Sequence, residues 1–206
     1  MTVIRRKPVL TAFAVVASFA LSAMVSAQQS PQYKIAGVSR GMKGPEVKAK
    51  MAAAGYKLKS ENRAESFSQL VAFEKAKATG SRYQTPTFTE PMFQTWEKPG
   101  EMINLWYVQA PSGNVVKAGN YQFSGSAVDP AVVKSTLVSR YGPPKLVVGP
   151  RMNWCAKPAT GCKSNQEYMS FQSARVDIGG PTNEEGLRQL IADTARQSLP
   201  ASKPSF

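Results

Sequence analysis

The sequence predicts an α+β fold in which helices pack on a small antiparallel sheet. Three observations lead to this class. Four segments have helical spacing with recognisable ends, one long segment reads as a hairpin, and four short apolar segments surround the only two cysteines. The order of helix followed by strands occurs twice along the chain, which is compatible with two tandem helix-plus-sheet units.

The first 27 residues have the order of parts of a secretory signal peptide. A basic start is followed by an apolar run from Val9 to Met24, and small residues end at Ala27. Because the run is shorter than the roughly 20 residues of a spanning helix, we expect cleavage after Ala27; a retained anchor is the alternative. The prediction is a periplasmic protein with no transmembrane span after cleavage.

Beyond the signal peptide, we expect a polar lead-in over residues 28–34, one α+β domain over 35–200 and a disordered tail over 201–206. The two possible halves of the domain are 35–127 and 128–200. The signal holds three of the 26 basic residues, so 23 basic and 13 acidic residues remain and give a net charge of +10. This charge favours anionic partners. The basic residues form no run of five or more, however, and the alternative is that the charge serves solubility alone.

Four segments with helical punctuation are residues 44–58, 65–80, 129–144 and 181–200. Pro45 and Pro130 suit the first position of a helix, while Gly55, Gly80 and Gly142 are stop signals. These features predict two helices in each half of the domain.

Side chains at the starts of three segments have the spacing of helix caps. Ser66 with Gln69, and Thr182 with Glu185, form predicted capping boxes, and Asp129 is a predicted N-cap. In the second segment the alternation around residues 71–73 would also fit a strand.

Strands are predicted between the helices. Residues 102–124 read as a hairpin with a turn at 111–114, and four further segments surround the cysteines. These segments are 145–149, 151–155, 167–172 and 174–179. The run from Leu105 to Val108 has no clean alternation, which predicts burial on both faces, with an exposed aromatic surface as the alternative.

The chain contains no histidine, and this absence excludes several classes of chemistry. It removes the usual general base at neutral pH, the serine and cysteine nucleophiles that depend on histidine, and the commonest transition-metal ligand. Glu184 and Glu185 are the best local pair of carboxylates for glycoside chemistry, but helix capping explains them. No catalytic residue, metal ligand or cofactor is predicted.

Cys155 and Cys162 are predicted to form a disulfide. Six residues separate them, including Pro158 and Gly161, whereas oxidoreductases place two residues between their cysteines. Two thiols are too few for a cysteine zinc site, and the expected compartment is oxidising. We expect the bond to hold a turn between two strands, with Trp154 packed beside it.

A segment before the first predicted helix resembles a known family. It comprises Ile35 to Met42, then Pro45 to Val47, then Gly55 with Tyr56. This pattern resembles the SmpA/OmlA outer-membrane assembly family and the related fold of β-lactamase inhibitor protein, which implies helix pairs on a small antiparallel sheet. Two departures are the missing lipid-bearing cysteine, which puts outer-membrane anchoring in doubt, and Lys43 at a position where such motifs place serine or threonine.

The favoured function is a non-enzymatic binding or scaffolding module of the cell envelope, acting by protein–protein interaction through a sheet surface or its loops. The alternative is a binder of anionic envelope polymer or lipid headgroups, and a third hypothesis is a histidine-free cell-wall hydrolase. No specific nucleic acid is expected, and the oligomeric state is open. Candidate interaction residues are Trp96, Trp106, Tyr107, Arg40, Lys43, Lys48 and Lys50. The alternative for the aromatic residues is that they are buried in the core. The alternative for the basic residues is that they form a solvated face of the first helix.

Overall fold

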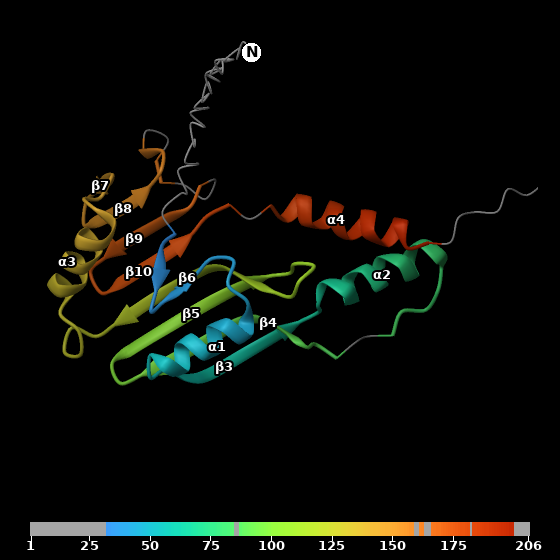
Figure 1. The fold of residues 1–206 in the computed structure, drawn as a ribbon, viewed down its shortest axis with the longest axis horizontal. Helices are drawn as coiled ribbons and strands as arrows, with labels where there is room; N and C mark the ends of the chain where they lie inside the picture. Colours follow the sequence, from blue (N-terminus) through green and yellow to red (C-terminus); the bar gives the residue numbers. More distant parts are fainter. Residues whose placement is uncertain (1–31, 85–86, 159–160, 163–165, 182, 200–206) are drawn as a thin grey trace, which may run out of the picture.

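The structure is a computed structural model that describes residues 32–84, 87–158, 161–162, 166–181 and 183–199. The predicted signal peptide, the tail over 201–206 and Thr182 lie outside the described residues. Within these ranges the chain forms four α-helices, an eight-stranded antiparallel sheet and a separate two-stranded hairpin (Figure 1). The α+β class is confirmed, but the sheet is large rather than small and it dominates the fold.

Two four-stranded meanders make up the eight-stranded sheet, and they meet at its centre. In spatial order the strands are β3 (Lys57–Ala64), β4 (Glu90–Lys98), β5 (Glu101–Val108), β6 (Val115–Phe123), β10 (Arg175–Gly179), β9 (Tyr168–Gln172), β8 (Arg151–Cys155) and β7 (Leu146–Val148). Consecutive strands pair within each meander, and only the β6–β10 pair joins one to the other. The predicted hairpin over 102–124 and the four strands around the cysteines are confirmed.

The four predicted helices are present, and their ends follow from local capping. They are α1 (Gly44–Ala53), α2 (Phe67–Thr79), α3 (Pro130–Tyr141) and α4 (Glu184–Gln197). The capping box of Ser66 and Gln69 begins α2, which excludes the strand interpretation of that segment. The Asp129 carboxylate accepts a hydrogen bond from the Ala131 amide at 2.8 Å and caps α3.

The start of α4 differs from the prediction. Its N-cap is Asn183, whose side-chain oxygen accepts a hydrogen bond from the Gly186 amide at 2.8 Å. Asparagine is as good an N-cap as serine or aspartate, and it stands one residue closer to the apolar stripe of the helix than Thr182 does. The helix therefore begins one residue later than the predicted capping box implies.

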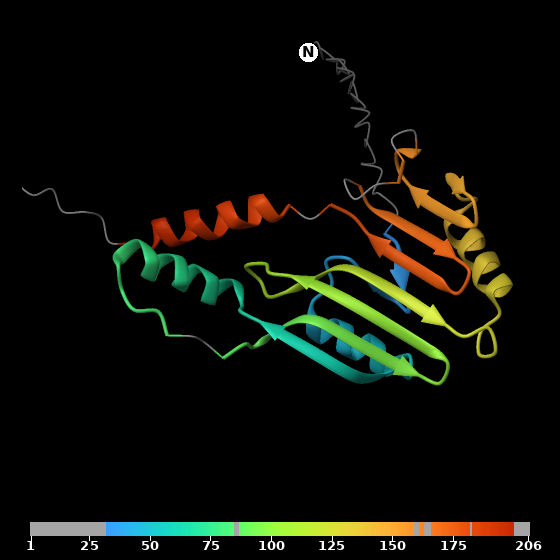
Figure 2. The same ribbon diagram turned by 180° about the vertical axis from the view of Figure 1, so that it is seen from behind.

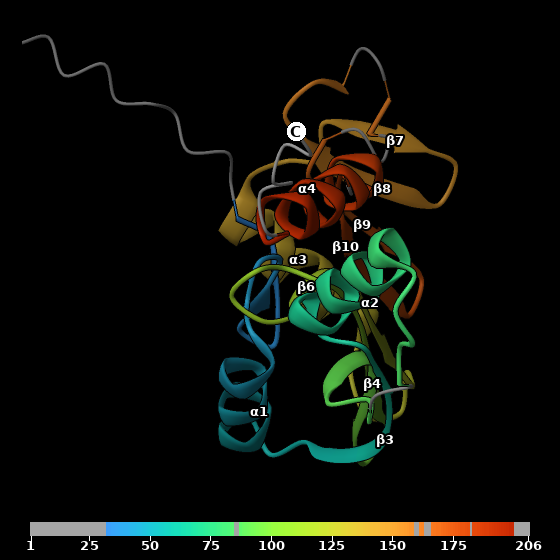
Figure 3. The same cartoon turned by 90° about the vertical axis from the view of Figure 1, so that its right-hand side faces the viewer.

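The helices divide into two groups around the sheet. The helices α1 and α3, together with the hairpin of β1 (Lys34–Ile35) and β2 (Val38–Ser39), cover one face (Figure 3). By contrast, α2 and α4 lie side by side beyond one end of the sheet (Figures 1 and 2). The main core therefore lies between the sheet and α1, α3 and the hairpin. Its most deeply buried side chains are Val38, Val47, Met51, Ile103, Leu105, Val116, Trp154, Met169 and Ile178.

Two parts of the fold were not expected. Strands β3 and β4 precede the predicted hairpin and extend the sheet on that side. Tyr33 and Lys34 belong to the packed fold rather than to an unpacked lead-in, because Tyr33 is buried and its ring meets that of Tyr141 edge-on at 5.4 Å. The aromatic contact with α3 explains why this short segment is held.

Candidate functional site

The face of the eight-stranded sheet opposite α1 and α3 is called the open face here, because no helix of the described residues covers it (Figure 3). Side chains alternate between faces along a strand. On β5, Ile103 and Leu105 point into the core, so Asn104 and Trp106 point to the open face. The strand register then determines which residues stand beside each other on this surface.

A line of polar residues crosses the middle of the open face. Cross-strand pairing places Thr95 opposite Asn104, Asn104 opposite Asn120, Asn120 opposite Asp177, Asp177 opposite Ser170, and Ser170 opposite Asn153. We call these six residues the polar row. It runs in an unbroken line from β4 through the central β6–β10 pair to β8 and so spans both meanders.

Hydrogen bonds connect the first part of the polar row. The Thr95 hydroxyl donates to the Asn104 side-chain oxygen at 2.8 Å, and the Asn104 amide donates to the Asn120 oxygen at 3.1 Å. Further along, the Ser170 hydroxyl donates to Asp177 at 3.4 Å. Five of the six side chains are buried although no helix lies over them, because they are short and stand between rows of longer side chains.

An aromatic row borders the polar row on one side. Phe93 lies opposite Trp106 on β4 and β5, and their ring centroids are 5.3 Å apart. On β9, Tyr168 lies opposite Gly179, where a Cβ would come within 2.7 Å of the tyrosine ring. The glycine leaves room for the Tyr168 ring to lie across β10.

A row of five longer side chains, four of them polar or charged, borders the polar row on the other side. Glu97, Met102, Gln122, Arg175 and Gln172 stand opposite one another from β4 to β9. Salt bridges neutralise much of the charge, since Lys59 meets Glu97 at 2.7 Å and Arg175 meets Asp177 at 2.7 Å. The open face thus combines aromatic, amide and paired ionic groups.

The structure separates the predicted aromatic candidates. Trp106 is half-buried on the open face, whereas Trp96 and Tyr107 lie in the core with exposed fractions of 3% and 4%. The polar ends of both core residues donate to the Gln94 side-chain oxygen, at 3.1 Å from the Trp96 ring nitrogen and 2.6 Å from the Tyr107 hydroxyl. Only Trp106 of these three is placed for contact with a partner.

The predicted basic residues are also separated. Arg40 is half-buried and donates to the Lys117 carbonyl at 2.8 Å, to Glu167 at 3.1 Å and to the Pro181 carbonyl at 2.7 Å, so it connects three parts of the fold. The side chains of Lys43, Lys48 and Lys50 are exposed before and along α1. Their role in binding stays a prediction.

The disulfide between Cys155 and Cys162 is confirmed, and its Cα atoms are 5.5 Å apart. Cys155 is the last residue of β8, so the bond closes the segment that leads towards β9. Trp154 is buried beside it, as expected, and its ring nitrogen donates to the Gly142 carbonyl at 2.8 Å.

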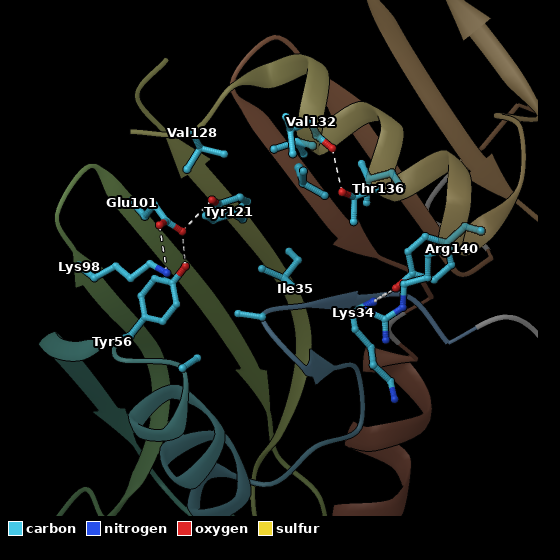
Figure 4. Close-up of a pocket in the computed structure, with 16 residues that line it drawn as sticks. Lys34, Ile35, Tyr56, Lys98, Glu101, Tyr121, Val128, Val132, Thr136 and Arg140 are labelled. Carbon is cyan, nitrogen blue, oxygen red and sulfur yellow. Dashed lines mark hydrogen bonds and ion pairs between the residues drawn. The ribbon is translucent and has the colours of Figure 1, made fainter. Parts of the chain in front are cut away.

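A cleft of about 470 Å³ lies on the helix-covered side, between the end of α1, strand β1 and α3 (Figure 4). Glu101 stands at one end. Its Oε2 atom accepts hydrogen bonds from the hydroxyls of Tyr56 at 2.6 Å and Tyr121 at 2.7 Å, while Oε1 lies 3.0 Å from the Lys98 ammonium. Lys34 and Arg140 stand at the other end.

The charges in this cluster follow from its contacts. Burial by itself raises the pKa of Glu101, but the hydrogen bonds from Tyr56 and Tyr121 and the Lys98 ammonium outweigh it, so the pKa lies below its usual value. Burial, and then the neighbouring carboxylate, raise the pKa of both tyrosines. At neutral pH the cluster is therefore an ionised carboxylate held by two neutral phenols and one ammonium.

The polar row is a feature that sequence reasoning missed. Asparagine is depleted in strands, yet Asn104, Asn120 and Asn153 each stand near the middle of a segment rich in apolar residues. An asparagine inside a predicted strand is therefore the sequence signal by which these three residues could have been recognised as a group. Which of them face each other depends on the register, and the β5–β6 pair contains an irregularity after Trp106 that the sequence does not reveal.

Within the described ranges, none of the helices combines the length and the apolar composition needed to cross a bilayer. In the same part of the chain, no three histidine, cysteine, aspartate or glutamate residues gather closely enough to hold a metal ion. No protein-family model, curated protein or solved structure matches the chain.

Proposed function

We propose that the chain is a secreted, periplasmic, non-enzymatic binding module of the cell envelope that acts by protein–protein interaction through the open face. The observation that carries this proposal is the half-buried pair of Trp106 and Phe93 beside the polar row. Interfaces concentrate aromatic anchors next to polar groups whose hydrogen bonds are satisfied, and tryptophan is among the residues that contribute most to affinity. The disulfide supports an oxidising compartment.

The arrangement of the polar row supports a rigid binding surface. Hydrogen bonds within the row fix its side chains before any partner arrives, which reduces the entropy lost on binding. The row also spans both meanders, so the whole face can act as one surface. We further propose that the two halves, 35–127 and 128–200, are tandem units, because each contains a helix followed by the four strands of one meander, with α2 inserted between β3 and β4 in the first half.

The test is affinity capture from an envelope extract at low and high salt, with matched variants. Trp106→Ala removes the aromatic anchor, and Gln172→Trp adds bulk at an exposed position of the same face. Leu190→Ala, on the exposed side of α4, removes apolar surface elsewhere and is the control. The proposal expects a protein that stays bound at high salt, is lost with the first two variants and is retained with the control.

Thermal unfolding of each variant separates lost contact from lost fold. A captured protein that both open-face variants retain would contradict the use of this face. Capture of anionic polymer alone would overturn the protein–protein proposal.

The second candidate function is the binding of anionic envelope polymer or lipid headgroups. The observation that favours it is the net charge of +10 after removal of the signal peptide. Attraction between exposed charges is screened over about 10 Å at 0.1 M salt. Binding that disappears between low and moderate salt, and that does not depend on Trp106, would support this candidate.

A further inference from the structure

The cleft between α1, β1 and α3 is separate from the open face, because it lies on the helix-covered side of the sheet (Figure 4). Its volume of about 470 Å³ falls within the range of small-molecule sites, roughly 300 to 1,000 Å³. Such sites are mostly apolar with a few polar groups that orient the ligand. The cleft has this composition. Its charged groups stand at its two ends, and Thr136, whose hydroxyl donates to the Val132 carbonyl, is a polar residue between them.

The middle of the cleft is mostly apolar. Its apolar lining side chains come from β1, from β10, from the turn before α3 and from α3 itself. They are Ile35, Val128, Val132, Val133, Leu137 and Val176. Ile35 lies between the two ends in Figure 4, and Val132 is 58% exposed at the surface of α3. An exposed valine beside an apolar channel leaves hydrocarbon surface in contact with water.

The two ends differ in charge. Glu101 already has Lys98 as its ionic partner and two phenol donors, so that end is neutral overall. At the other end, Lys34 and Arg140 form no ion pair with any carboxylate of the described residues. The cleft therefore has two uncompensated positive charges at one end of an apolar channel.

We propose that the cleft binds a single-chain anionic amphiphile, namely a fatty carboxylate. The carboxylate lies at Arg140 and Lys34, and the hydrocarbon chain follows the valines of α3 and Ile35 towards Tyr56 and Tyr121. Charge complementarity selects the headgroup, because a guanidinium and an ammonium both favour a carboxylate. The chain gains affinity by burial, at about fourfold for each methylene group removed from water.

The proposal is tested by titrating the secreted chain with octanoate, decanoate and dodecanoate at neutral pH, below their micelle concentrations, in a calorimeter. Dodecyltrimethylammonium has the same chain with the opposite charge and is the matched probe. We expect affinity to rise with each pair of methylene groups and the cationic probe to bind at least tenfold more weakly than dodecanoate.

Three variants locate the binding. Arg140→Gln removes one cationic group and should weaken dodecanoate binding about tenfold, the effect of losing one charge-assisted hydrogen bond. Lys134→Gln changes the charge equally on the same helix, at an exposed position that does not line the cleft, and should leave the affinity unchanged. Ala54→Phe, at an exposed position of the lining, fills the cleft and should abolish binding.

Thermal unfolding shows that each variant is folded. The proposal is overturned if dodecanoate does not bind, if both dodecyl probes bind equally, or if folded Ala54→Phe binds dodecanoate as the original chain does. Equal losses for Arg140→Gln and Lys134→Gln would also overturn it, because they would show a general charge effect. These failures are distinguishable from failure of the proposed function, which concerns capture of a protein by the other face of the sheet.

Discussion

Asn104 on β5 lies directly opposite Asn120 on β6, the last two strands of the first meander, and its side-chain amide donates to the Asn120 oxygen at 3.1 Å. Both residues are buried. A shift of one residue in register would turn every side chain of the strand to the other face and would leave these amides in the core. The pair therefore favours one register of β5 on β6 over its neighbours.

Replacing Asn104 tests the contribution of the polar row to stability. In Asn104→Ala the Thr95 hydroxyl loses its acceptor and the Asn120 oxygen loses a donor. Buried groups left without partners cost about 1–3 kcal/mol, so we expect the free energy of unfolding in urea to fall by that amount. Gln172→Ala, at an exposed position of the same face, is the control and should change it by less than about 0.5 kcal/mol. Equal effects of the two variants would contradict the prediction.

The Glu101 cluster predicts a specific dependence of stability on pH. Because the folded state lowers the pKa of Glu101, its contribution is complete above the unfolded pKa and is lost as the pH falls through the lower folded value. Glu101→Gln should therefore lower the free energy of unfolding by about 2 kcal/mol at pH 7. The difference from the original chain should shrink as the pH is lowered from 7 towards 3, because protonation of Glu101 removes the stabilisation that its carboxylate gives to the folded state. Urea unfolding at both values checks this, and an identical difference at both would contradict it.

The two tryptophans of the first meander should differ in their effect on folding. Trp96→Ala removes a core side chain and should cost about 3–5 kcal/mol, whereas Trp106→Ala removes a half-buried side chain from the open face and should cost clearly less. Thermal unfolding of both variants measures the difference. A larger loss for Trp106→Ala would mean that its main role is in the fold rather than in binding.

Removal of the disulfide should lower the stability of the fold mainly by raising the conformational entropy of the unfolded chain. Replacing Cys155 and Cys162 by serine releases a closed loop of eight residues, for which chain entropy predicts a loss of about 2.5 kcal/mol. The unfolding midpoint in urea with and without reductant provides the same comparison on the original chain. Thiol labelling of the native protein before reduction should fail, and rapid labelling would contradict the presence of the bond in solution.

The sequence was most informative where local chemistry determines structure. Ser66 with Gln69 and Asp129 predict the starts of α2 and α3, because a cap acts over only a few residues. Strand β3 could not be recognised in the same way. Its sequence, KLKSENRA, is polar except for Leu58 and Ala64, since an edge strand with both faces largely exposed has no apolar alternation to show. The lysines that hide the strand in the sequence also discourage pairing with another chain at this edge.

The candidate binding regions were only partly predictable. A tryptophan is visible in the sequence as a possible anchor. Whether it faces the core or solvent depends on its place in the alternation of side chains along its strand, and this alternation places Trp96 in the core and Trp106 on the open face. The cleft brings together Tyr56, Glu101 and Arg140, which lie far apart along the chain. Such a grouping follows from the tertiary packing and has no local signal.

The pairing of β6 with β10 has a kinetic consequence. Within the meanders, the strand pairs that are joined by short connections make local contacts and can form early; β3 and β4 are the exception, because α2 lies between them in the chain. The central pair instead joins Gln122 to Arg175, across the whole second meander, and closing that distance is the slower event. Until it happens, β6 presents an unprotected edge at which two nascent copies can associate. The time for which that edge stays unpaired is thus the period in which this protein is most exposed to aggregation.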